Sequence, residues 1–351
     1  MNFKRRNLLA LAGAAGLAGL AASFGAAPAQ AQEVTLRLHQ FLPAQANVPK
    51  YVLDVWADKV EADSNGRIKV QRFPSMQLGG KPPELIDQVI DGVADVVWTV
   101  AGYTPGRFPR AEVFELPFMM TNAEATSRAY WTLAEKYMVN DDFKDFHVLG
   151  LWVHGPGLIH SKEPIRKVSD LNGVKLRAPT RTTNMLLSAL GATPIGMPVP
   201  AIPEALSKGV IDGAVIPWEV AGILKVPELV HNHTEFPGAS LYTTSFIFAM
   251  NKDRYDSLPD DLKAVIDANS GLEFSAFAGK TQAAYDAPIR KDAVDLGNNI
   301  IELSPDEIQE WRDASQGTID TWIKEMDDRG LDGTGLVEEA RGLIAKFTAG
   351  N

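Results

Sequence analysis

The chain has 351 residues, carries a formal net charge of −10 at pH 7 and contains no cysteine. This length accommodates one large domain or two medium domains with a sizeable hydrophobic core. The acidic balance disfavours nucleic acid as a partner, and the lack of thiols excludes a cysteine nucleophile, a thiolate metal site and a redox pair.

The first residues have the layout of an export signal. A Lys-Arg-Arg cluster at 4–6 precedes an apolar, Ala- and Gly-rich run at 8–22, and A-Q-A at 29–31 matches a cleavage site. We therefore predict a signal peptide over residues 1–31, a mature chain that begins at Gln32, and a periplasmic location. The arginine pair also suits the twin-arginine export route. A membrane anchor is the less favoured alternative, because the run is short and followed by the cleavage site.

The segments that follow alternate between strand and helix patterns. The expected order is strand 34–41, helix 52–60, strand 67–73, helix 82–92 and strand 96–98. A β-α-β-α-β order predicts a mostly parallel sheet. Ligands of such sheets bind beyond the carboxyl ends of the strands, which here are Phe41 and Trp98.

A proline-rich loop at 103–118 leads into a second series, and we interpret Gly155-Pro156-Gly157 as the crossing into a second domain. The expected elements are helix 122–138, strands 147–153 and 174–177, helices 182–190 and 201–208, strand 211–216, a β-rich run at 242–250 that returns to the first domain, and helices 305–328 and 337–346. The segment 260–297 contains almost no helix breaker, so much of it is expected to form one long helix.

Arg177 ends the short strand 174–177, which Pro179 cannot continue. An arginine buried at that position needs an anionic partner, because its five N–H donors cannot be left without acceptors. The partner is either a structural Asp or Glu or a bound ligand.

Seven short motifs follow one another along the chain. They are F-P-S-M-Q-L-G at 73–79, G-V-A-D at 92–95, L-P-F at 116–118, G-V-K-L-R-A-P at 173–179, G-A-T-P at 191–194, G-V-I-D-G at 209–213 and L-P-D-D-L at 258–262. In this order they resemble the DctP-like solute-binding proteins of tripartite ATP-independent periplasmic (TRAP) transporters, over nearly the whole mature chain.

This resemblance implies an α/β, two-lobed periplasmic binding protein with a ligand cleft between the lobes and a long connecting helix. Lobe I would comprise residues 32–154 plus 242–282, and lobe II residues 155–241 plus 283–351. In that family the arginine that matches Arg177 holds the substrate carboxylate. The partners implied are a small organic acid and the TRAP membrane permease subunits, and the protein is expected to be a monomer.

The predicted ligand-binding residues are Arg177, Phe41, Trp98, Tyr103, Thr180, Val199, Ile216 and Trp218. Phe41, Trp98 and Tyr103 follow strand ends, and ligand contact and core packing are equally favoured for them. Trp56, Trp311 and Trp322 lie within helices and are expected to pack in the core.

The ligand prediction depends on departures from the sialic-acid-binding relatives. Those relatives use a second arginine where this chain has Gly157, and asparagines where it has Phe41, Thr180 and Ile216. A sugar acid would leave buried hydroxyls unpaired against such a lining. We therefore predict a small monocarboxylate with an apolar or aromatic body. An aliphatic oxo- or hydroxy-acid, a dicarboxylate and a sugar acid are the alternatives.

Signals for an enzyme or a metal centre are weak. The chain has no G-x-S-x-G, H-E-x-x-H or P-loop motif, so we predict no catalytic role and no cofactor, with a periplasmic α/β enzyme as the less favoured alternative. His231 and His233 are expected to lie on the surface. Glu219, after Pro217-Trp218, could serve a bound cation as in some relatives, but no metal site is predicted. A sensor that presents its closed form to a membrane kinase would use the same site.

Overall fold

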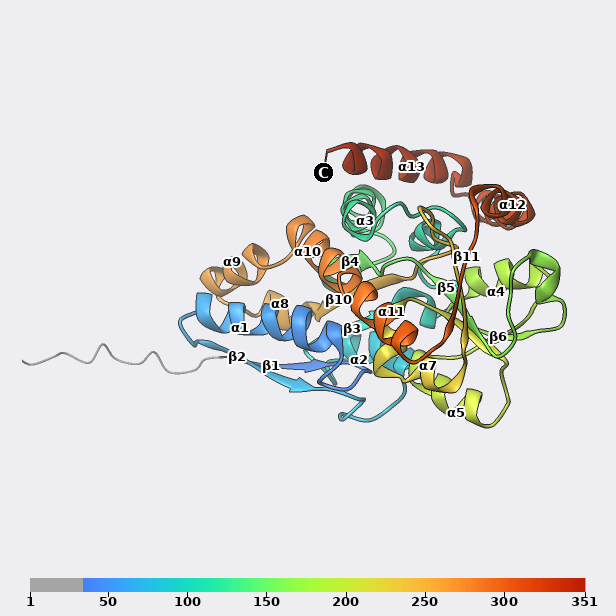
Figure 1. The fold of residues 1–351 in the computed structure, drawn as a ribbon. Helices are drawn as coiled ribbons and strands as arrows, with labels where there is room; N and C mark the ends of the chain where they lie inside the picture. Colours follow the sequence, from blue (N-terminus) through green and yellow to red (C-terminus); the bar gives the residue numbers. More distant parts are fainter. Residues whose placement is uncertain (1–33, 351) are drawn as a thin grey trace, which may run out of the picture.

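The computed structural model describes residues 34–350. The predicted signal peptide and the cleavage before Gln32 lie outside these residues. Within the described part of the chain, no helix is both long and apolar enough to cross a membrane. The chain forms two sheets, each flanked by helices (Figure 1).

The first sheet has the strand order β2-β1-β3-β10-β4. Its strands are β1 (Val34–His39), β2 (Ile68–Phe73), β3 (Val96–Val100), β4 (Phe146–Val153) and β10 (Ser245–Asn251). β1 is parallel to β2 and β3, as the strand–helix alternation predicts. β10 is antiparallel to β3 and β4, and it enters this sheet after the chain has passed through the second one.

Most of the helices around the first sheet follow the predicted pattern. They are α1 (Asp54–Asp63), α2 (Leu85–Ile90), α3 (Ala123–Tyr137), α8 (Lys252–Asp256), α9 (Asp260–Ala268), α10 (Leu272–Ala283) and α13 (Gly333–Ala349). Short helical turns occur at Pro49–Leu53, Pro82–Glu84, Ala101–Tyr103 and Arg110–Glu115. α13 comes last in the chain and packs across α3 (Figure 1).

The second sheet has the order β11-β9-β5-β8-β6-β7. Its strands are β5 (Leu158–Ser161), β6 (Lys175–Ala178), β7 (Thr193–Gly196), β8 (Gly213–Ile216), β9 (Asn232–Glu235) and β11 (Asn299–Glu302). β6 lies between β7 and β8 and is parallel to both, whereas β5 is antiparallel to β8 and β9. β5, β7, β9 and β11 have no counterpart among the predicted strands.

The helices beside the second sheet are α4 (Arg181–Ala189), α5 (Ile202–Ser207), α6 (Trp218–Ile223), α7 (Val226–Leu229), α11 (Asp286–Asp295) and α12 (Pro305–Asp328), with short turns at Val168–Leu171 and Val199–Ala201. α12 has the predicted bounds, because Ser304 and Glu307 form a capping box at its start. The assignment of lobes by residue range stays a prediction.

The prediction of one long helix within 260–297 is wrong. Three helices, α9, α10 and α11, occupy this segment. The first break is at Gly271, which has φ 91°, a conformation that disfavours any other residue. Its N–H donates to the carbonyl of Leu149 at 2.8 Å, so the break also ties α10 to β4. The second break, at Ala284 and Tyr285, places the Tyr285 ring against Tyr51, with 4.8 Å between ring centroids.

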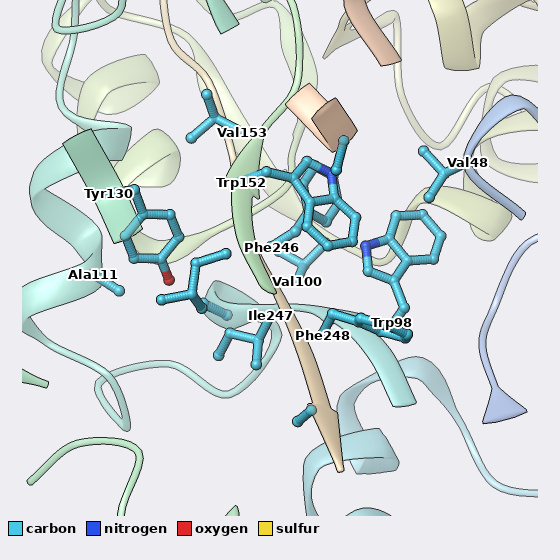
Figure 2. Close-up of a cluster of buried hydrophobic side chains, with 14 of the residues drawn as sticks. Val48, Trp98, Val100, Ala111, Tyr130, Trp152, Val153, Phe246, Ile247 and Phe248 are labelled. Carbon is cyan, nitrogen blue, oxygen red and sulfur yellow. The ribbon is translucent and has the colours of Figure 1, made fainter. Parts of the chain in front are cut away.

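The largest buried cluster includes aromatic side chains from three strands of the first sheet (Figure 2). Trp98 of β3 and Trp152 of β4 stack with a centroid distance of 6.1 Å and an interplanar angle of 4°. Phe246 of β10 lies 5.2 Å from Trp98 and 5.7 Å from Trp152. Trp56, Trp311 and Trp322 are buried, which confirms their prediction as packing residues.

Candidate ligand site between the two sheets

A cavity of about 40 Å³ lies where the carboxyl ends of strands from both sheets meet. Its walls are Phe41, Leu42, Trp98, Val100, Tyr103, His154, Arg177, Pro179, Val199, Ile216, Pro217, Glu219, Val220, Tyr242, Thr244, Phe246 and Gln282. A water molecule needs roughly 10–15 Å³ of such space, so the cavity has room for about three water molecules.

Arg177 reaches this cavity from β6. The turn before the strand depends on Gly173, which has φ 76° and donates its N–H to Gly191 O at 3.1 Å. The guanidinium is buried, with 2% of the residue exposed. Its Nε donates to Met197 O at 2.9 Å and its Nη1 to Val215 O at 3.1 Å.

No acidic side chain within residues 34–350 forms an ion pair with Arg177. Burial lowers the pKa of Arg177, while the neighbouring Tyr103 and Tyr242 act in the opposite direction. The structure therefore excludes a described Asp or Glu as its ion-pair partner. A buried cation whose acceptors are carbonyl oxygens and a neutral phenol is well suited to an anionic ligand.

Two tyrosine hydroxyls lie near the guanidinium. The Tyr103 oxygen accepts a hydrogen bond from the Val199 N–H at 2.9 Å, which leaves its own proton available. The Tyr242 hydroxyl has no hydrogen-bond partner in the described part of the chain. Burial raises the pKa of both phenols, so both are donors at neutral pH. Tyr242 was not predicted, because it precedes β10 in a loop without a distinctive motif.

His154 is a second cavity residue that sequence reasoning missed. Its Nδ1 lies 2.6 Å from Gly155 O and its Nε2 lies 3.0 Å from the Thr244 hydroxyl. Burial lowers the pKa of His154 to about 4, and the Arg177 charge acts in the same direction. The imidazole is therefore neutral at pH 7, with Nδ1–H donating to the carbonyl and Nε2 accepting from Thr244. It adds no charge beside Arg177.

Aromatic side chains form an apolar wall. Phe41 stacks on Trp98 with 4.6 Å between centroids and 19° between planes, and it meets Tyr103 edge-on at 5.7 Å. These residues were predicted to contact either the ligand or the core. The structure shows that each is buried and also lines the cavity. A planar apolar group fits such a wall by offset stacking.

A buried carboxyl group, that of Glu219, also lines the cavity. Gln282 Nε2 donates to Glu219 Oε1 at 2.6 Å, and Gln282 Oε1 accepts from Trp152 Nε1 at 2.9 Å. The Glu219 N–H donates to Asp286 Oδ1 at 2.9 Å, which fixes the start of α6. Burial raises the pKa of Glu219 to about 8, so its carboxyl is mostly neutral at pH 7.

Val199 and Ile216 line the cavity, whereas Thr180 and Trp218 do not. Thr180 caps α4, where its Oγ1 accepts from the Thr183 N–H at 3.4 Å. The Trp218 Nε1 donates to Glu235 Oε1 at 2.7 Å, which directs the indole toward β9.

The expectation that His231 and His233 lie on the surface is wrong for His233. His231 is exposed, but His233 is buried and lies 2.8 Å from His160, measured between the Nδ1 atoms. The reason is that β9 is an interior strand of its sheet, between β11 and β5. Among the residues that the structure describes, no group of three His, Cys, Asp or Glu side chains could hold a metal ion.

Gly157 has no room for a side chain. A Cβ atom at this position would overlap the Tyr242 ring and approach the Tyr242 carbonyl. The Gly157 N–H donates to that carbonyl at 3.0 Å. Tyr242 thus fills the space beside Gly157, and Arg177 is the one cation among the side chains that line the cavity.

Comparison with known proteins agrees with this geometry. The family profile described as bacterial extracellular solute-binding protein, family 7 (DctP), matches residues 39–325. The chain is similar to a TRAP solute-binding protein from Rhodoferax ferrireducens, solved with copurified benzoate. The two are 51% identical with a TM-score of 0.88, over 90% of this chain and 98% of the other.

Two further relatives share the fold. A marine metagenome TRAP solute-binding protein specific for aromatic acid ligands, solved with 3-hydroxybenzoate, is 51% identical with a TM-score of 0.88, over 90% of this chain and 99% of the other. The C4-dicarboxylate-binding periplasmic protein DctP of Rhodobacter capsulatus is 27% identical over 282 residues, 80% of each chain.

Proposed function

The chain belongs to family 7 of the bacterial extracellular solute-binding proteins, and we propose that it is a TRAP receptor for a small aromatic monocarboxylate. The observation that carries this proposal is Arg177, a buried guanidinium without an acidic partner in residues 34–350, in the wall of an aromatic cavity. Benzoate and 3-hydroxybenzoate in the two structures that are 51% identical support the same ligand class.

The chemistry of the lining favours one carboxylate over two. Arg177 is the one cation that lines the cavity, and Tyr103 and Tyr242 add neutral donors beside it. A dicarboxylate would leave its second charge against aromatic rings or near Glu219, at a high desolvation cost. A sugar acid would leave several hydroxyls without partners along Phe41 and Trp98.

The receptor role follows from the family. In this proposal the mature chain is a periplasmic monomer that closes on its ligand, hands it to the TRAP membrane permease and has no catalytic role. Light scattering of the purified mature chain measures the oligomeric state. Uptake of labelled benzoate into vesicles that contain the permease measures delivery, and uptake that does not depend on the receptor would contradict it.

A calorimetric panel tests the ligand class. Benzoate, mandelate, succinate, pyruvate and galactonate are titrated into the mature protein, and each is also tested by thermal shift. We expect binding of the aromatic acids with a negative heat-capacity change, since apolar surface is buried. A ligand at 100 times its Kd should raise the free energy of unfolding by roughly 2.7 kcal/mol. Tight binding of succinate or galactonate without any aromatic acid would overturn the proposal.

A further inference from the structure

The cavity has polar groups in two separate places. Arg177, at the end of β6, is held by Met197 O and Val215 O. Glu219, at the start of α6, is held by Gln282 and Asp286, and within residues 34–350 it forms no ion pair with Arg177. A ligand whose carboxylate meets Arg177 therefore presents another part of its body to Glu219.

We propose that the Glu219 carboxyl group is a second recognition point, which forms a hydrogen bond with a hydroxyl group on the ring of the bound acid. This inference rests on the proposed function and narrows it, since the favoured ligands become hydroxyl-bearing aromatic acids. The feature that carries it is a buried carboxyl group that lines an otherwise aromatic cavity.

The position of this carboxyl group is fixed by a chain of hydrogen bonds. Trp152 Nε1 holds the Gln282 carbonyl, and Gln282 Nε2 in turn donates to Glu219 Oε1. The backbone N–H of Glu219 is held by Asp286, at the start of α11. Three separate elements thus orient Glu219, which is the arrangement expected of a group that recognises a defined ligand atom.

The groups around Glu219 favour the neutral carboxyl form. Gln282 of α10 and Asn47 contribute amides, and Asp286 of α11 is a half-buried acid whose pKa is itself raised. Glu219 forms no ion pair with any Lys, Arg or His within residues 34–350. A neutral carboxyl has one O–H donor and free acceptor lone pairs, which match a phenol hydroxyl that both accepts and donates.

Matched ligands distinguish hydrogen bonding by the ring hydroxyl from the effect of its size. The 2-, 3- and 4-hydroxybenzoates are titrated beside the 2-, 3- and 4-methylbenzoates, because a methyl group occupies similar space without hydrogen bonding. For the parent protein we expect at least one hydroxybenzoate to bind about tenfold more tightly than its methyl counterpart. The measured quantity is the ratio of the two Kd values, obtained by calorimetry at pH 7.

Variants of Glu219 test whether this residue causes the difference between the two Kd values. Glu219→Leu should reduce their ratio to near one, and Glu219→Gln should keep part of it, since an amide also donates and accepts. If Glu219→Leu does not fold, Glu219→Met replaces it with an unbranched side chain that adapts to the same space. Glu115→Gln is the control, because Glu115 is a buried carboxyl outside the cavity lining, and it should keep the parent ratio.

Three results would overturn the inference. One is a parent protein that binds benzoate but shows no hydroxyl preference, which leaves the proposed function intact. Another is a ratio that survives in the apolar Glu219 variant. The third is a preference abolished by a chelator, which would make Glu219 a cation ligand. If no aromatic acid binds at all, the proposed function fails as well.

Discussion

The Tyr103 hydroxyl oxygen accepts a hydrogen bond from the Val199 N–H at 2.9 Å, which joins the turn after β3 to the turn after β7. The bond links the two sheets across the mouth of the Arg177 site. Because the phenol keeps its proton, it can donate to a carboxylate while it accepts from Val199. Tyr103 therefore joins the two sheets through a hydroxyl group that also lines the cavity.

Tyr103→Phe should weaken aromatic-acid binding by about tenfold or more. The change removes a donor to the ligand and leaves the Val199 N–H without an acceptor, at a cost of roughly 1–3 kcal/mol. Calorimetry measures the loss. Tyr130→Phe is the matched control, since the Tyr130 hydroxyl is buried without a partner among the described residues and lies outside the cavity. Equal affinity of Tyr103→Phe and parent would show that Tyr103 only fills space.

Gly157→Ala should destabilise the protein and weaken ligand binding together. The added Cβ would displace Tyr242, so both the backbone contact and the cavity wall must shift. Overpacking of this kind costs roughly 1–3 kcal/mol. Denaturant unfolding measures the free energy of unfolding, and calorimetry measures the affinity for the aromatic acid.

Gly317→Ala is the control for that variant. Gly317 lies within α12 and has open space around it, so alanine should be neutral or stabilising by up to about 1 kcal/mol. If Gly157→Ala retains parent stability and affinity, Tyr242 is not held in place by its contact with residue 157.

The sequence allows long periodic elements and the place of Arg177 at a strand end to be predicted. The residues 305–328 carry a strong helical period and a capping signal, and α12 has those bounds. Arg177 was identifiable because Pro179 closes its strand, which places the side chain at a strand end, and because the family resemblance implies a carboxylate-binding arginine there. Phe41 and Trp98 were located by the same rule about strand ends.

The rest of the site depends on contacts between distant parts of the chain. Gln282 and Glu219 are 63 residues apart, and His154 and Thr244 are 90 residues apart. No local pattern marks such pairs. Thr180 was predicted from an aligned binding position; its hydroxyl caps α4, and its role in ligand binding stays a prediction.

Stability should fall as the pH rises from 6.5 to 8. Burial raises the pKa of Glu115 and Glu219 to about 8 and that of Asp286 to about 7. In this window the folded chain holds these protons and the unfolded chain has released them, so each rise in pH favours unfolding. Each glutamate contributes on the order of 1 kcal/mol across the window.

The histidines oppose this trend. The pKa values of His39, His147, His154, His160 and His233 are lowered by burial, so these residues increase stability as the pH rises through 6.5. Above pH 6.5 each adds at most about 0.4 kcal/mol, less than a glutamate removes. Thermal melts of the ligand-free protein at pH 6.5 and 8 check the sign. Glu115→Gln should reduce the slope, and Glu310→Gln, at an exposed site, should not. A melting temperature that rises across this window would contradict the buried neutral carboxyls.

Arg177→Ala should weaken binding of any aromatic acid by at least about tenfold. The ligand carboxylate would lose a charge-assisted pair, worth roughly 1.5–3 kcal/mol for each hydrogen bond, and would be buried without a cation. Arg177→Lys should recover only part of the affinity, because an ammonium group lacks the planar fork that meets both carboxylate oxygens. Calorimetry with benzoate measures both variants.

The ligand-free fold should tolerate either change. Arg177 has no acidic partner in the described chain, so its removal breaks no ion pair, although Met197 O and Val215 O lose a donor. Melting of the ligand-free variants measures this independently of binding. Parent-like affinity in Arg177→Ala would place the carboxylate elsewhere in the cavity. Unfolding of the ligand-free Arg177→Ala protein would instead make the two carbonyl contacts the main role of this arginine.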